Sequence, residues 1–175
     1  MDKDKYNKKT SVALLSVLSN SVLVIFKLII GTIIGSVSVI SEAIHSGMDL
    51  AAALLAFFAV RLAGKHADED HPFGHEKVEN ISAAVEALLI FIAAGWIIYE
   101  GVKKLINPEP IETIGWGVGV MLFSAIANLI VSQRLFKVGK NTDSAALMAD
   151  GWHLRTDVYT SAGVMTGLAF ICQGG

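Results

Sequence analysis

The run LVIFKLIIGTII, residues 23–34, decides the class of fold. Only Lys27, Gly31 and Thr32 interrupt its apolar side chains, and a second run, residues 51–60, has no polar side chain at all. Of the 175 residues 53% are hydrophobic and 17% are charged, whereas soluble domains carry roughly 25% charged residues. Helices of a soluble bundle would show a polar outer face with a period of about 3.6 residues, and these runs show little of it. The sequence therefore predicts a membrane protein.

Five stretches are long enough to cross a bilayer, which takes about 20 apolar residues per helix. We expect an all-α fold, a polytopic transmembrane helix bundle in a single domain over residues 11–175, preceded by a cytoplasmic tail of residues 1–10. The five predicted spans are residues 11–34, 37–62, 78–105, 114–136 and 145–172.

The basic residues in the tail, in the connections and near the ends of the spans are distributed unevenly. On an alternating topology only Lys103 and Lys104 fall on one side of the bilayer. Because cytoplasmic loops carry the excess of lysine and arginine, we expect a multi-pass protein of the plasma (inner) membrane with its amino terminus in the cytoplasm. The residues that fall on that cytoplasmic side are Lys3, Lys5, Lys8, Lys9, Arg61, Lys65, Lys77, Arg134, Lys137 and Lys140.

Two of the predicted spans carry a histidine and an aspartate four residues apart, His45 with Asp49 and His153 with Asp157. Residues at this spacing project from the same helix face. If the two faces meet, two imidazoles and two carboxylates surround one point, a ligand set that suits tetrahedral Zn²⁺ and balances its charge. Carboxylates that lose the metal would recover protons, which predicts exchange of metal for protons. The alternative is that the pairs are hydrogen-bonded polar contacts between helices.

The loop between the second and third spans offers a second possible ligand set. His71 and His75 are four residues apart, and Asp68 and Asp70 precede them. Histidine nitrogen and carboxylate oxygen at this spacing could hold a metal. The alternative is a solvated acidic loop that contains histidines by chance.

Other ionisable residues lie inside the predicted spans, among them Asp150, Glu86 and Lys27, and such a group usually has a partner or a function. Asp150 shares a helix face with His153, and we expect it either to support that histidine or to admit the ion from the cytoplasm. Glu86 is expected to form a charge pair with another helix. Lys27 either pairs in the same way or extends toward the far membrane surface.

These segments together resemble the cation diffusion facilitator family. The resemblance rests on SEAIHSGMD at residues 41–49, on HPFGHEKVE at 71–79, and on His153 with Asp157, in order along the whole chain. It implies a homodimeric exporter that exchanges cytoplasmic Zn²⁺ for protons by alternating access. The transport site it implies is His45, Asp49, His153 and Asp157, and a secondary cytoplasmic metal site is implied at Asp68, His71 and His75.

The resemblance also bears on the metal and on the length of the chain. Histidine at position 45 is typical of zinc-selective members, whereas aspartate there accepts cadmium more readily. Histidine and carboxylate accept several divalent metals, so Co²⁺, Fe²⁺, Cd²⁺ and Mn²⁺ are alternative substrates. The family pattern has a sixth span and usually a carboxy-terminal domain, so we expect this five-span chain to be truncated before them.

Two other classes of function compete with transport. The segment HEKVE, residues 75–79, resembles the helix of zinc peptidases, but Glu79 stands where their second histidine belongs. A cage of four protein ligands also leaves no position for a catalytic water, so we expect no enzyme.

The alternative to transport is a membrane metal sensor or assembly partner that moves no ion. The expected partners are the lipid bilayer, divalent metal ions, protons and a second copy of the chain, with no nucleic acid.

Overall fold

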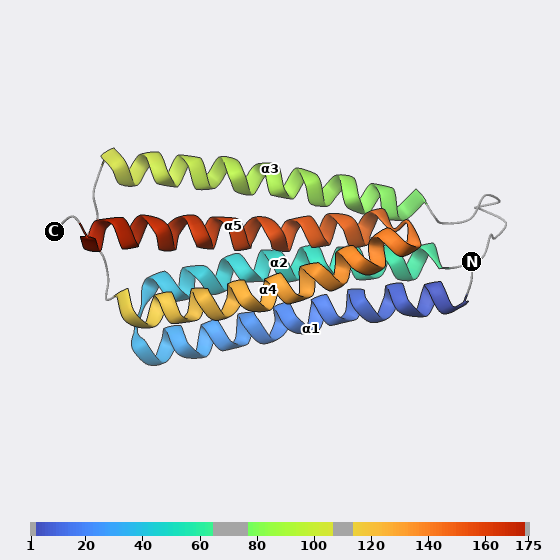
Figure 1. Ribbon diagram of the computed structural model, residues 1–175, viewed down its shortest axis with the longest axis horizontal. Helices are drawn as coiled ribbons and strands as arrows, with labels where there is room; N and C mark the ends of the chain where they lie inside the picture. Colours follow the sequence, from blue (N-terminus) through green and yellow to red (C-terminus); the bar gives the residue numbers. More distant parts are fainter. Residues whose placement is uncertain (1–2, 65–76, 107–113, 174–175) are drawn as a thin grey trace.

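The computed structural model describes residues 3–64, 77–106 and 114–173, and these residues form a bundle of long helices (Figure 1). The elements are α1 (Lys3–Ile34), α2 (Val37–Ala63), α3 (Lys77–Ile106), α4 (Ile114–Thr142) and α5 (Ala145–Gln173). The predicted all-α bundle is confirmed.

Four of the helices are long and apolar enough to cross a membrane. The segments that qualify lie in α1 to α4 and are Lys3–Ile34, Val39–Ala63, Lys77–Tyr99 and Val118–Thr142. Their large apolar side chains are widely exposed on the outside of the bundle, as lipid contact requires. Over its described residues α5 is not in this group, and it carries Asp150, Arg155 and Asp157 in its first half. The fifth span therefore stays a prediction.

Two helices extend beyond the apolar runs that predicted them. Helix α1 begins at Lys3 rather than at Ser11, so residues 3–10 of the predicted tail are helical, and α4 continues to Thr142. The extended part of α1 contains a buried ion pair, in which Lys9 Nζ lies 2.8 Å from Glu79 Oε1 on α3. Ser144 Oγ donates a hydrogen bond to the other carboxylate oxygen of Glu79. These contacts join α1 and α3 to the turn that precedes α5.

The helices alternate in direction along the bundle (Figure 1). The amino-terminal ends of α1, α3 and α5 lie together with the carboxy-terminal ends of α2 and α4. We call this the basic end, and the other the far end. The basic residues at the basic end are Lys3, Lys5, Lys8, Lys9, Arg61, Lys77, Arg134, Lys137 and Lys140. The one-sided charge expected from the sequence is thus present in the fold, and the orientation in a particular membrane stays a prediction.

A tight turn at the far end fixes how α1 and α2 face each other. Gly35 adopts a left-handed φ of 66°, which glycine accepts at little cost. The Ser36 side chain then caps α2 by accepting a hydrogen bond from the backbone N–H of Val39 at 3.3 Å. Because the turn is so short, residue 27 of α1 lies opposite residues 42–46 of α2.

The apolar core lies among α1, α2, α4 and α5 and is built largely from small side chains. Small residues let membrane helices approach closely, and α1 packs along α2 while α4 packs along α5. Helix α3 packs against α5 and α2. This packing brings α2 and α5 into contact at the middle of the bundle. The core cluster is Ala13, Ala56, Ala59, Val60, Val131, Leu135, Ala146, Leu147 and Leu154.

Candidate metal centre

The two histidine and aspartate pairs predicted from the sequence meet between α2 and α5. Nε2 of His153 lies 3.1 Å from Oδ1 of Asp49, and Nε2 of His45 lies 3.7 Å from Oδ1 of Asp157. Each histidine thus faces the aspartate of the other helix rather than its own i,i+4 neighbour. The helix spacing supplies the two faces, and the packing of α2 against α5 joins them.

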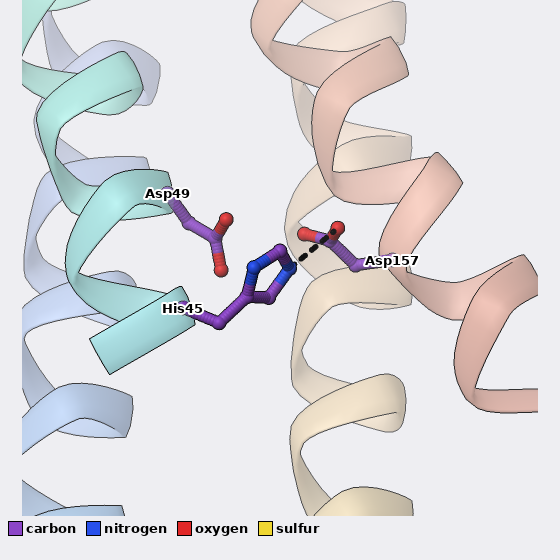
Figure 2. Close-up of side chains that lie close together, drawn as sticks. All are labelled: His45, Asp49 and Asp157. Atoms are coloured by element: carbon purple, nitrogen blue, oxygen red, sulfur yellow. Dashed lines mark ion pairs between the residues drawn. The ribbon is translucent and has the colours of Figure 1, made fainter. Parts of the chain in front are cut away.

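Three of the four side chains converge closely enough to share an ion. Figure 2 shows His45 and Asp49 pointing from α2 toward Asp157 of α5, and one ligand atom from each lies within 4.8 Å of the others. Two ligands of a tetrahedral Zn²⁺ at about 2.1 Å are separated by roughly 3.4 Å. Small side-chain rotations would therefore bring these atoms to coordinating distance.

Burial leaves part of this cluster without hydrogen-bond partners. Asp49 and His153 are buried, and His45 and Asp157 are partly buried. Within the described part of the chain, Oδ2 of Asp157 and Nδ1 of His153 have no hydrogen-bond partner. A buried polar atom left unpaired costs about 1–3 kcal/mol, and more if it is charged. A cation bound between the carboxylates would remove part of that cost.

A cavity of about 180 Å³ adjoins the cluster, and residues from each of the five helices line it. Since a water molecule takes about 30 Å³ in the liquid, the cavity has room for an ion together with several waters. Nε2 of His153 reaches Asp49 from outside this lining. The lining residues are Lys27, Glu42, His45, Asp49, Ile97, Met121, Ser124, Ala125, Asn128, Asp157, Thr160 and Ser161.

Lys27 has a partner inside the bundle, which decides between its two predicted roles. Its Nζ lies 3.2 Å from Oε2 of Glu42 and donates a hydrogen bond to Oγ of Ser46 at 2.8 Å. Our reading of the sequence had assigned nothing to Glu42 or Ser46. The short turn at Gly35 was the signal that could have found them, because it places residue 27 opposite residues 42–46.

We expected Glu86 to form a charge pair with another helix, and among the described residues this prediction is wrong. Glu86 is fully buried, but its contact is a hydrogen bond of 3.1 Å from Ser82 Oγ on its own helix. No basic side chain in the described ranges forms an ion pair with it.

Asp150 is also fully buried, and neither of its carboxylate oxygens has a hydrogen-bond partner in the described part of the chain. No hydrogen bond joins Asp150 to His153, so the expected support of this histidine is not observed as a direct contact. Its predicted role in admitting the ion from the cytoplasm stays a prediction.

The secondary site of Asp68, His71 and His75 lies within residues 65–76, outside the described residues, and also stays a prediction.

Comparison with known proteins adds to this geometry. The sequence pattern of the cation efflux transmembrane domain matches residues 13–173. The chain belongs to the cation efflux family. The resemblance seen in the sequence is thereby confirmed, and with four apolar helices the cation efflux protein is an integral membrane protein.

Several relatives of this family member cover most of its length. It is 34% identical over 154 residues to the cation-efflux pump FieF of Yersinia enterocolitica, which covers 88% of this chain and 51% of the relative. It is 42% identical over 139 residues to an uncharacterised transporter of Synechocystis, with 79% and 45% covered. The magnetosome protein MamB of Magnetospira is 29% identical over 158 residues, with 85% and 51% covered. The chain spans about half the length of the curated relatives it matches.

Proposed function

We propose that the chain forms the ion-carrying part of a secondary transporter, which exports a divalent transition metal, Zn²⁺ above all, from the cytoplasm in exchange for protons. The observation that supports this most is the convergence of His45, Asp49 and Asp157 within 4.8 Å in a bundle of apolar helices. The name of one relative, the cation-efflux pump FieF of Yersinia enterocolitica, agrees with export from the cytoplasm.

The ligand chemistry supports a doubly charged ion. Asp49 and Asp157 supply two negative charges, and His45 and His153 supply neutral nitrogens, so that a bound Zn²⁺ is balanced. Metal ligands must release their protons before they coordinate. The same side chains can therefore hold the ion or protons in turn, and this is the physical basis of an exchange. If His153 joins the other three side chains as the fourth ligand, no position remains for a catalytic water, and we therefore propose a role that is not enzymatic.

The topology supports a path from the basic end to the far end. By the positive-inside rule the basic end faces the cytoplasm, which puts the amino terminus there and suits a plasma (inner) membrane protein. Alternating access in a homodimer completes the proposal, and light scattering from the detergent-solubilised chain would measure the oligomer.

The first experiment measures Zn²⁺ binding to the purified chain by titration calorimetry in detergent. We expect about one Zn²⁺ per chain at the cluster of α2 and α5, and Asp157→Asn should remove it. Asp143→Asn is the matched control, because Asp143 is exposed at the turn between α4 and α5 and its φ of 51° suits asparagine. An unchanged titration in Asp157→Asn would contradict the assignment.

The second experiment measures flux. The chain is reconstituted in lipid vesicles that enclose a zinc-sensitive dye, and a pH gradient is imposed. Transport predicts Zn²⁺ uptake that follows the gradient, stops when the gradient is collapsed and is absent in Asp157→Asn. Zinc binding without flux would count against transport and favour the metal sensor or assembly partner.

A further inference from the structure

Lys27 is the one lysine or arginine among the described residues that line the cavity of the metal centre. Its side chain is almost fully enclosed, with the residue 4% exposed. A charged group inside the bilayer costs several kcal/mol unless it has partners, and Lys27 has Glu42 and Ser46. The cavity that would receive a divalent cation therefore contains a fixed positive charge. The proposed transport site does not explain this charge, because it repels the cation.

The ion pair stands beside the metal ligands, on the side of the far end. Helix α2 starts at the far end with Val37, and Glu42 precedes His45 by one turn. Ser46, the second partner of Lys27, directly follows His45 in the same helix. An ion that leaves the cluster for the far end would therefore leave past Lys27 and Glu42.

We propose that Lys27 sets the affinity of the metal centre by electrostatic repulsion of the divalent ion, while Glu42 limits that repulsion by pairing with the ammonium group. The inference rests on the proposed function, since it assigns a second determinant to the same site. An ion carrier must bind strongly enough to load and weakly enough to unload. The positive charge of Lys27 lowers the affinity and so speeds release.

The charges of the pair make opposite predictions for its two members. Lys27→Gln leaves the Glu42 carboxylate unpaired, so the cavity gains a net negative charge and binds the cation more tightly. Glu42→Gln leaves the ammonium group unpaired, so the cation binds more weakly. Changing both together restores the original net charge. A pair that only held α1 against α2 would instead weaken binding in every variant, or leave it unchanged.

The test measures the Kd of Zn²⁺ by competition with a chelating dye, and its dissociation rate by stopped flow, on the detergent-solubilised chain. Because two charges in one cavity interact over a short distance at moderate effective dielectric, each single change should alter Kd by at least about tenfold. Lys27→Gln should lower Kd and slow dissociation, and Glu42→Gln should raise Kd. The Kd of the double variant should return to within about threefold of that of the unmodified chain. The Kd of Lys27→Arg, which keeps the positive charge, should equal that of the unmodified chain.

Lys137→Gln, at an exposed position on α4, is the control for loss of a lysine and should leave Kd unchanged. A Kd in folded Lys27→Gln that is equal to or higher than that of the unmodified chain overturns the inference. If Lys27→Gln does not fold, a Kd in Glu42→Gln that is equal or lower overturns it. If the unmodified chain itself binds no Zn²⁺, the proposed function is overturned. If the unmodified chain binds Zn²⁺ but the Kd is the same in the variants, only this inference is overturned.

Discussion

Nε2 of His153 lies 3.1 Å from Oδ1 of Asp49, so a buried imidazole of α5 rests against a buried carboxylate of α2. The contact joins two helices at the level where the other pair, His45 and Asp157, also meets. In this arrangement each candidate ligand faces a candidate ligand of the opposite helix. An incoming cation would replace direct contacts between ligands with bonds to itself, so that the four side chains respond together.

Asp49→Asn tests whether this carboxylate carries charge to the ion or only positions His153. Asparagine keeps the size and can still hydrogen-bond to the imidazole, but one negative charge and one strong ligand are lost. We expect the Kd for Zn²⁺ to rise by at least about 100-fold, measured by dye competition, with helical content unchanged by circular dichroism. Ser124→Ala is the control, because Ser124 lines the same cavity but hydrogen-bonds to the backbone of its own helix. Equal losses in both variants would argue for a general disturbance of the cavity.

Zinc binding should release protons from the chain. At lower pH protons compete more strongly with the metal for its ligands, so the affinity for Zn²⁺ falls as pH falls. We expect a higher Kd at about pH 6 than at about pH 8, and a proton signal from a pH indicator in weak buffer that appears on adding Zn²⁺. Asp157→Asn should give neither signal. A Kd that does not change over this pH range would rule out coupling through these ligands.

The apolar runs were sufficient to predict the number of helices, because each run had to find an apolar environment over a length close to the bilayer thickness. They were not sufficient to predict where α1 begins. The extended part of α1 packs through Lys9 against Glu79, which lies on a different helix, and no local pattern in the tail reports such a contact.

The residues of the candidate site could also be predicted from the sequence, but their pairing could not. The four-residue spacing of His45 with Asp49 and of His153 with Asp157 identifies two polar faces, since helix geometry alone places such residues together. Which atoms then meet depends on the rotation of α2 against α5, and this is why the partners cross between the helices. The error at Glu86 has the same origin, because its sequence neighbours do not tell which helices surround it.

Gly31 allows α1 to approach the start of α2. A Cβ at this position would lie 2.9 Å from Cγ1 of Ile40 and 3.1 Å from its backbone nitrogen, which cannot rotate away. We expect Gly31→Ala to lower the free energy of unfolding by about 1–3 kcal/mol, as other overpacked sites do, measured by denaturant titration in detergent micelles. Gly95→Ala on α3 is the matched control, since nothing lies within 4 Å of its added Cβ. It should leave stability unchanged or raise it, and a fall of equal size there would show that close packing is not the cause.

Glu79 holds three helices together at the basic end, through the ion pair with Lys9 and the hydrogen bond from Ser144. Both charged residues are buried, with Lys9 7% and Glu79 5% exposed. Removing one partner leaves the other charge buried and unpaired, so Glu79→Ala should lower the free energy of unfolding by about 3–5 kcal/mol. The double variant Lys9→Met/Glu79→Leu removes both charges and should recover most of that loss. Denaturant titration in micelles measures both, and a double variant as unstable as Glu79→Ala would show that the damage comes from packing and not from the unpaired lysine.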